Sequence, residues 1–199
     1  MLADIMPTAY EVGVLNGRVS PPTPSPWSGP VRSDWPPSRP PGCSHARVIA
    51  VDVAESRLEA ARLFGADTTI LASADPDGMV TEMTDGLGAD VVIEAVGVPD
   101  TFELCTRLVR AGGHLANVGV HGKPVTLHLE DLWIKNLTIT TGLVDTYSTP
   151  TLMSMLATGQ LDTAPFVTHH FPMEAMIEAY DAFSRASDTG ALKVVLTRS

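Results

Sequence analysis

The strongest constraint on the fold is a repeated alternation of short apolar runs and helical patterns that begins at residue 47. The run 48–51 ends at Asp52, and a helical pattern through 57–64 follows and is capped by Gly65. Further runs at 69–71, 90–96, 114–118 and 137–143 alternate with helical patterns near 78–85 and 100–110, closed by Gly97 and by Gly112-Gly113. Strands that alternate with helices predict an α/β fold with a doubly wound parallel sheet covered on both faces.

The segments on either side of this alternation have a different character. Residues 1–19 show apolar side chains at helical spacing, which predicts a short amphipathic helix. Nine of the 16 prolines fall between Pro21 and Pro41, so we expect no helix or central strand there and an irregular, disordered stretch over 21–46. After the last alternating run, helices near 149–158 and 173–186 and a strand at 192–197 are expected.

Composition excludes several classes of function. Lys and Arg number 13 against 23 Asp and Glu, and the resulting charge of -10 repels phosphate backbones and anionic lipids, which argues against nucleic-acid and membrane partners. No run reaches 18 apolar residues and the first residues do not resemble a signal peptide, so a cytoplasmic location is expected. Only Cys43 and Cys105 occur, which gives no four-cysteine zinc site and little reason for a disulfide.

Asp52 is the most informative single residue. An acid at the end of this strand can accept hydrogen bonds from both hydroxyls of an adenosine ribose and repels a 2′-phosphate, which favours NAD over NADP. The competing interpretation is an N-cap for the following helix. Arg57, five residues later, is either a cationic contact to the ribose or part of a solvated helix face.

Several blocks of sequence occur in the order and spacing of one family. The strings 48–52 with 57–66, Gly88 to Gly97, Leu108 to Gly113, Asn117 to Val120, Val167 to Pro172 and Gly190 to Val195 are similar to successive elements of the zinc-dependent medium-chain alcohol dehydrogenases. The resemblance covers residues 47–199, with 1–19 added at the front. It implies a Rossmann-like dinucleotide-binding domain over 1–143, a segment 144–199 that returns to the family's catalytic domain, and a parent reaction of NAD-dependent hydride transfer to or from an alcohol.

The resemblance also implies roles for individual residues. Ala95, Val96 and Gly97 would lie beside the riboses, Val118, Gly119 and Val120 would present backbone groups to the nicotinamide end, and Lys193 would face the pyrophosphate. Leu143 and Val144 match the stretch that binds the carboxamide, Thr8 matches a threonine packed against the nicotinamide, and Asp4 matches a zinc ligand of some members. Each has a plainer alternative, since valines and glycines at strand ends pack and turn, a terminal lysine faces solvent and a lone Asp caps a helix.

The histidines give no metal site. His169 and His170 are neighbours on an extended strand, so their side chains point to opposite faces. His114, His121 and His128 have no matching carboxylate or cysteine spacing.

Two departures from the family shape the functional prediction. The chain starts after the domain that supplies the zinc ligands and the proton relay, so we expect a truncated enzyme with no catalytic residues of its own, inactive alone, with zinc only in the full-length parent. The G-x-G-x-x-G loop that holds the pyrophosphate is also missing, because the proline-rich stretch occupies its place, so NAD binding by this chain is expected to be weak or absent.

The stretch from Pro22 to Ser44 is predicted to be a frame-shifted part of the same gene. Suitable GC-rich codons for it, read one base out of frame, give an apolar strand, a G-x-G-x-x-G turn and a helix. The shifted turn would then stand close to the roughly 20 residues before Asp52 that such a site requires.

Two other functions remain open. A non-catalytic binding or oligomerisation protein would use the sheet edge near 137–143, where a homo-oligomer contact is expected. A zinc-free quinone or enoyl reductase would share the fold, and Asp4 argues against it. The apolar face of the segment after Val144 lacks its family partner, which favours association.

Overall fold

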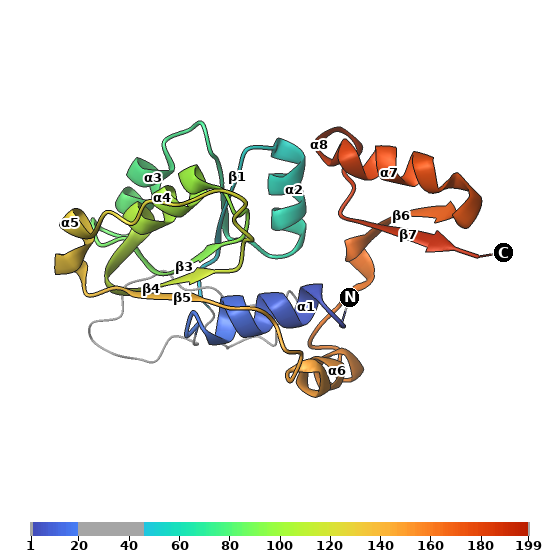
Figure 1. Cartoon of the computed structure of the whole chain (residues 1–199), viewed down its shortest axis with the longest axis horizontal. Coiled ribbons are helices and arrows are strands. Elements are labelled where there is room, and N and C mark those ends of the chain that lie inside the picture. Colours follow the sequence, from blue (N-terminus) through green and yellow to red (C-terminus); the bar gives the residue numbers. More distant parts are fainter. Residues whose placement is uncertain (1, 20–45, 199) are drawn as a thin grey trace.

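The computed structural model describes residues 2–19 and 46–198 (Figure 1). The predictions for the proline-rich stretch and its frame shift, and for Cys43, therefore lie outside the described residues. No helix in the described ranges is long and apolar enough to cross a membrane.

The alternation of strands and helices is present as expected. The strands of this part are β1 (Ile49–Asp52), β2 (Thr68–Leu71), β3 (Ala89–Glu94), β4 (Val109–Asn117) and β5 (Thr138–Thr141). The helices are α2 (Glu55–Leu63), α3 (Pro76–Met83), α4 (Pro99–Leu108), α5 (Leu129–Leu132) and the short η2 (Trp133–Lys135). These elements confirm the α/β class.

All strand pairs are parallel, and the sheet is divided between β1 and β3. β1 pairs with β2, and β3, β4 and β5 pair in that order. Among the described residues, the order β2-β1 and then β3-β4-β5 corresponds to a doubly wound sheet of the usual order 3-2-1-4-5-6 without its first strand, which would lie between β1 and β3. The structure therefore contains the two outer parts of the predicted sheet without a hydrogen-bonded connection between β1 and β3 in the described residues.

The core lies between the strands and the helices α3 and α4. Ile70, Val80, Ala89 and Leu108 form a buried cluster. Side chains of both sheet parts, including Val51 of β1 and Val92 of β3, pack against it, so one helical layer holds the two parts together.

The front helix covers the opposite face of β3 and β4. It begins as α1 (Ile5–Thr8) and continues as a π-helix, η1 (Ala9–Leu15), with bonds such as Asn16 N–H to Glu11 O at 3.0 Å. Gly13 lies against Ile93 and Val118, where an added Cβ would have its nearest atoms at 3.5–3.6 Å. Residues 5–15 are thus helical as expected, but with the wider π geometry that sequence periodicity does not reveal.

Two expected boundaries are wrong. Helix α4 ends at Leu108, and β4 begins at Val109 and continues through Gly112-Gly113, which were expected to separate helix from strand. β3 ends at Glu94, so Ala95 and Val96 belong to a turn and not to the strand.

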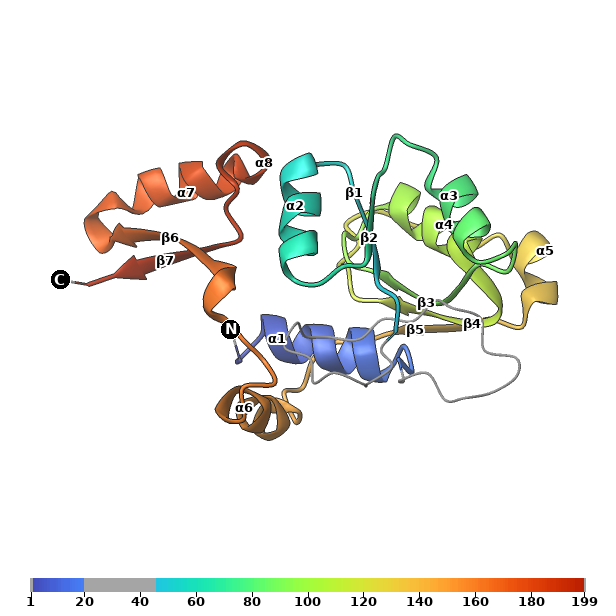
Figure 2. The same cartoon turned by 180° about the vertical axis from the view of Figure 1, so that it is seen from behind.

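Residues 144–198 form a smaller region beside this unit (Figures 1 and 2). Its elements are α6 (Thr149–Ala157), η3 (Ala164–Phe166), β6 (Val167–Pro172), η4 (Met173–Ala175), α7 (Met176–Ser184), α8 (Ala186–Thr189) and β7 (Lys193–Thr197). β6 and β7 pair in parallel, and the helix expected over 173–186 is divided into η4, α7 and the start of α8.

Several contacts join this region to the rest, among them a buried cluster of Met6 with Leu152 and Leu161. The rings of Phe64 and Phe166 stack with centroids 4.4 Å apart, and Ser56 Oγ donates to the carbonyl oxygen of Ser187 at 2.8 Å. Helix α2 lies between the sheet and the part formed by β6, β7, α7 and α8 in both views, whereas α6 lies beside α1 (Figures 1 and 2). A further contact, at Glu11, is described below.

Candidate functional site

Two turns meet at the carboxyl ends of β3 and β4. One leads from Glu94 through Ala95–Gly97 into α4, and the other leads from Asn117 through Val118–Val120. Val118 and Gly119 N–H donate to the carbonyl oxygen of Glu94 at 2.7 and 3.0 Å, which joins the second turn to the end of β3. Open α/β sheets bind their ligands at this edge.

The two turns touch through glycines. Gly97 has φ 84°, and a Cβ there would strike the backbone of Val120. A Cβ at Gly119 would strike Gly97 N and Glu94 Oε2. The backbones approach this closely only because neither residue has a side chain.

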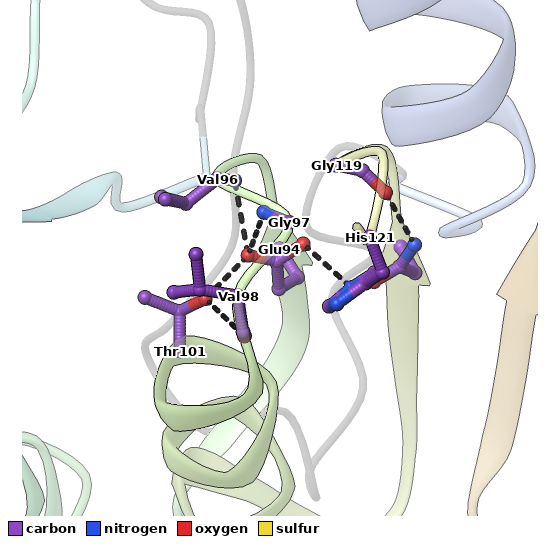
Figure 3. Close-up of polar contacts among 8 residues, drawn as sticks. Glu94, Val96, Gly97, Val98, Thr101, Gly119 and His121 are labelled. Atoms are coloured by element: carbon purple, nitrogen blue, oxygen red, sulfur yellow. Dashed lines mark hydrogen bonds and ion pairs between the residues drawn. The ribbon is translucent and has the colours of Figure 1, made fainter. Parts of the chain in front are cut away.

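A buried carboxylate lies between the turns (Figure 3). Glu94 Oε1 accepts hydrogen bonds from Val96 N–H and Gly97 N–H, both at 2.9 Å, and from Thr101 Oγ1 at 2.6 Å. Thr101 lies in the first turn of α4, so Glu94 connects the turn both to its strand and to its helix.

The second turn carries its own side-chain contacts. Asn117 Nδ2 donates to the carbonyl oxygen of Gly119 at 2.9 Å, and Asn117 Oδ1 is 2.8 Å from His121 Nε2. His121 Nε2 is also 3.5 Å from Glu94 Oε2, an ion pair when the imidazole is protonated (Figure 3). Glu94 Oε2 and His121 Nδ1 are buried without a hydrogen-bond partner in the described part of the chain.

The surroundings keep Glu94 ionised. Burial raises the pKa of its carboxyl, but hydrogen bonds from Thr101, Gly97 and Val96 and the charge of His121 lower it more, so the pKa lies below the ordinary value. Cys105 on α4 is buried near this charge, and burial followed by the Glu94 charge raises the pKa of its thiol to about 12. The site therefore has one charged carboxylate and a neutral thiol beside it.

Asp52 lies at the carboxyl end of β1, as the sequence predicts. Its Oδ1 accepts a hydrogen bond from Ala54 N–H at 2.9 Å, and Ala54 is the N-cap residue of α2 without a side-chain cap bond. Asp52 thus shapes the turn before the helix without being its N-cap. Arg57 is half-buried in the first turns of α2, and its side chain has no hydrogen bond or ion pair among the described residues.

The front helix brings Thr8 and Asp4 together. Thr8 Oγ1 donates to Asp4 O at 2.7 Å and lies 3.4 Å from Asp4 Oδ1. Residues 2–19 and 46–198 contain no group of three His, Cys, Asp or Glu side chains that could hold a metal. The described residues therefore offer no ligand set that fits a zinc ion, and Asp4 as a ligand stays a prediction.

Leu143 and Val144 follow β5, and Leu143 is 91% exposed. Lys193 begins β7 in the C-terminal region, and its side chain has no hydrogen bond or ion pair within the described ranges. The structure thus brings together Val96, Gly97 and Gly119 but shows no contact between them and Lys193.

Glu11 fixes the segment after Leu143 to the front helix. It is only 4% exposed. Its Oε1 accepts from Ser148 N–H at 2.9 Å and Ser148 Oγ at 2.6 Å, and its Oε2 from the N–H groups of Asp145 and Thr146 at 3.2 and 3.3 Å. Burial raises the pKa of Glu11, but these hydrogen bonds lower it more, so the net pKa is below the ordinary value.

Sequence reasoning missed Glu94, Thr101, Asn117 and Glu11. Glu94 had a visible signal, because an acid inside an apolar strand pattern is buried, and a buried acid requires partners. Glu11 had none, because its partners are more than 130 residues away in the sequence.

Comparison with known proteins gives one consistent result. The family model described as zinc-binding dehydrogenase matches residues 42–158. An alcohol dehydrogenase of Cupriavidus necator is 31% identical over 159 residues, which is 77% of this chain and 43% of that protein.

Solved structures of zinc-binding dehydrogenases are also similar to this chain. A zinc-dependent alcohol dehydrogenase 2 from Streptococcus pneumonia, in its apo form, superposes with a TM-score of 0.82 at 36% identity, over 98% of this chain and 57% of that one. A zinc-binding dehydrogenase from Sinorhizobium meliloti 1021, bound to NADP, has a TM-score of 0.65 at 25% identity over 77% of this chain and 46% of that one.

Parallel strands alternating with helices, with glycine turns at the strand ends, place the chain in the Rossmann-like class of α/β proteins. It belongs to the zinc-binding dehydrogenase family, in which its relatives are oxidoreductases of the alcohol dehydrogenase type. The chain spans 43% of the length of the curated relative named above and 57% of the solved one.

Proposed function

We propose that the chain is the cofactor-binding half of a zinc-type alcohol dehydrogenase whose reaction is hydride transfer between an alcohol and NAD. The observation that carries this proposal is the pair of interlocked glycine turns at the carboxyl ends of β3 and β4, with Asp52 at the end of β1. The division near residue 143 into a dinucleotide-binding domain and a returning segment is part of the same proposal.

NAD fits these turns in part. The exposed apolar side chains Val96, Val120 and Leu143 offer surface on which the flat rings of a dinucleotide can pack. Asp52 Oδ2 has no hydrogen bond in the described part of the chain, so it can accept from a ribose hydroxyl. When bound, NAD supplies the hydride acceptor, and the residues of this chain bind and orient it.

The proposed NAD site is expected to lack the loop that binds the pyrophosphate. The G-x-G-x-x-G loop was expected where Pro22 to Ser44 stand, which is outside the described residues. We therefore expect the 199-residue chain to bind NADH more weakly than micromolar, as measured by fluorescence titration. Micromolar affinity would contradict the proposed loss of the phosphate loop.

Cofactor choice tests the role of Asp52. In a full-length protein with a repaired loop, NAD is expected to be preferred over NADP, and Asp52→Ser should narrow that preference by roughly tenfold, because the repulsion of a 2′-phosphate is removed. The comparison is of kcat/KM with the two cofactors, and Glu59→Ser on the exposed face of α2 is the control. Equal use of both cofactors before mutation would overturn the assignment.

Alcohol oxidation by these 199 residues alone is expected to be absent, since the described residues hold no zinc-binding group. Elemental analysis should find no stoichiometric zinc. If the chain instead bound one equivalent of zinc, and the Asp4→Ala variant lost it, Asp4 would be a zinc ligand in this chain and the prediction would be wrong.

Self-association is a second candidate activity. Strand β5 pairs only with β4 among the described strands, and three of its four residues are exposed, so its free edge can pair with a second copy. Thr138→Lys should then lower the sedimenting mass toward that of the monomer, and an unchanged mass would exclude the β5 edge as the contact between copies.

A zinc-free quinone or enoyl reductase is the other candidate parent. The alcohol dehydrogenases among the relatives favour the zinc-type parent over that reductase.

A further inference from the structure

The Glu94 side chain touches both glycine turns. Its Oε1 accepts from the first turn and from Thr101, and its Oε2 faces Gly119 and His121 of the second turn. It lies beneath the backbone that would meet the dinucleotide and is fully buried, so it cannot itself contact a ligand.

Both oxygens of Glu94 face hydrogen-bond donors. On the Oε1 side these are two backbone N–H groups and the Thr101 hydroxyl. On the Oε2 side, Asn117 Nδ2 is committed to Gly119 O, so Asn117 Oδ1 accepts and His121 Nε2 carries the proton that points toward it and Glu94.

Only a carboxylate presents an acceptor oxygen to both sides: Oε1 is hydrogen-bonded to the first turn, and Oε2, which has no hydrogen-bond partner in the described part of the chain, lies 3.5 Å from His121 Nε2. A glutamine of the same shape would place its NH2 group either against His121 Nε2 or against the three donors of the first turn. Each orientation buries opposed donors, which is costly even though the volume is unchanged.

We propose that Glu94 is a positioning residue for the dinucleotide, which sets the two turns at one fixed separation through the hydrogen bonds of Oε1 and the charge of Oε2 facing His121. This rests on the proposed function, because those turns are the residues assigned to the riboses and the nicotinamide. Thr101 on the Oε1 side and the Asn117–His121 pair on the Oε2 side are the other side chains that hold the turns around the carboxylate.

The test uses the 199-residue chain and amide hydrogen exchange, which needs no cofactor. Glu94→Gln should speed exchange in 95–98 and 117–121 by about tenfold, while exchange in β1, β2 and α6 stays within about twofold. Thr101→Val should affect 95–98 more than 117–121, because it removes a donor only from the Oε1 side.

Thr84→Val is the matched control. Thr84 is equally buried, accepts from Gly88 N–H at 2.8 Å, and lies at the end of α3 away from both turns. It should lower the melting temperature without selectively speeding exchange in either turn. A Glu94→Gln variant in which both turns stay protected, or in which exchange rises equally everywhere, would overturn the positioning role.

Acid pH provides a second readout. The Glu94 pKa is lowered in the fold, so its contribution is complete above the unfolded value of about 4.3 and is lost as pH falls through the lower folded value. The groups that face it are His121 from the second turn and the neutral Cys105 thiol from α4. Exchange in the two turns should rise in that acid range in the wild type, whereas in Glu94→Gln it should already be fast at neutral pH.

Millimolar NAD separates this proposal from the proposed function. If NAD slows exchange in both turns of the wild type, Glu94→Gln should weaken that effect by about tenfold. If NAD changes nothing in the wild type, cofactor binding by this chain is excluded, and the ligand-free exchange results still decide whether Glu94 holds the turns.

Discussion

The apolar side chains of β3 and β4 are buried to a different extent from those of β6 and β7. β3 and β4 lie between the front helix on one face and α4 on the other, and Leu115 and Ala116 are completely buried. β6 and β7 form only a two-stranded sheet, in which residues of β6 alternate between half-buried and exposed. The difference shows that apolar residues in a strand become a buried core only where another layer of secondary structure packs on that face of the sheet.

Helix α7 makes the contrast clearest. Its exposed apolar residues include Met176, Tyr180 and Phe183 at helical spacing, with Ile177 beside them at 81% exposure. On the front helix Met6 and Val12 are buried, and the exposed large apolar side chains of residues 5–15 are Ile5 and Leu15, one at each end. One helix is packed, and the other has a face that nothing in the described residues covers.

Matched leucine substitutions should show the largest difference between the regions. Leu115→Ala in β4 removes a completely buried side chain and should lower the free energy of unfolding by about 2–5 kcal/mol. Leu196→Ala in β7 removes a half-buried one and should cost less than about half as much. Urea unfolding measures both, and equal losses would mean that β7 lies in a core as complete as that of β4.

A smaller effect is expected where the regions join. Glu11→Gln leaves an amide that cannot accept from both Ser148 and the N–H groups of 145–146, so the C-terminal region should open more often. Proteolysis after residue 148 should accelerate by roughly tenfold, because cleavage follows the population of the open form. Glu59→Gln, an exposed acid on α2, is the control. If both variants are cut at the wild-type rate, Glu11 does not hold the regions together.

The smallest effect on stability is expected on α7. Ile177→Ser with Tyr180→Ser should change the free energy of unfolding by no more than about 0.5 kcal/mol, since both side chains are exposed. Association at high concentration should nevertheless decrease, as sedimentation can measure. A large loss of stability would show that the stripe is packed in solution.

The sequence predicts the elements between 47 and 143 well because each has a local pattern. The strand ending at Asp52, the helix capped by Gly65 and the parallel pairing all follow from apolar spacing and turn residues. Gly112-Gly113 misled because glycines in a strand can mark close backbone approach as well as a break, and Gly113 lies against Asp90 O.

The site is less predictable than the fold. Asp52 could be placed at the end of its strand from spacing alone and lies there, whereas Gly97 and Gly119, expected to close their strands, lie in the turns after β3 and β4. The bonds made by Glu94 and Glu11 depend on how turns distant in sequence meet, which no local pattern records. The π geometry of residues 9–15, a segment that packs against Ile93 through Gly13, has no local pattern in the sequence either.

The contact between Gly97 and Gly119 has a consequence for how the site tolerates change. A methyl group at either position would collide with the other turn, so each substitution alone should force the same separation. Once one substitution has moved the turns apart, the second should meet less collision, so the steric parts of the two penalties should be non-additive, whereas the backbone strain of a side chain at Gly97, where φ is 84°, remains. The cost of a side chain at Gly119 therefore depends on whether Gly97 has already been replaced.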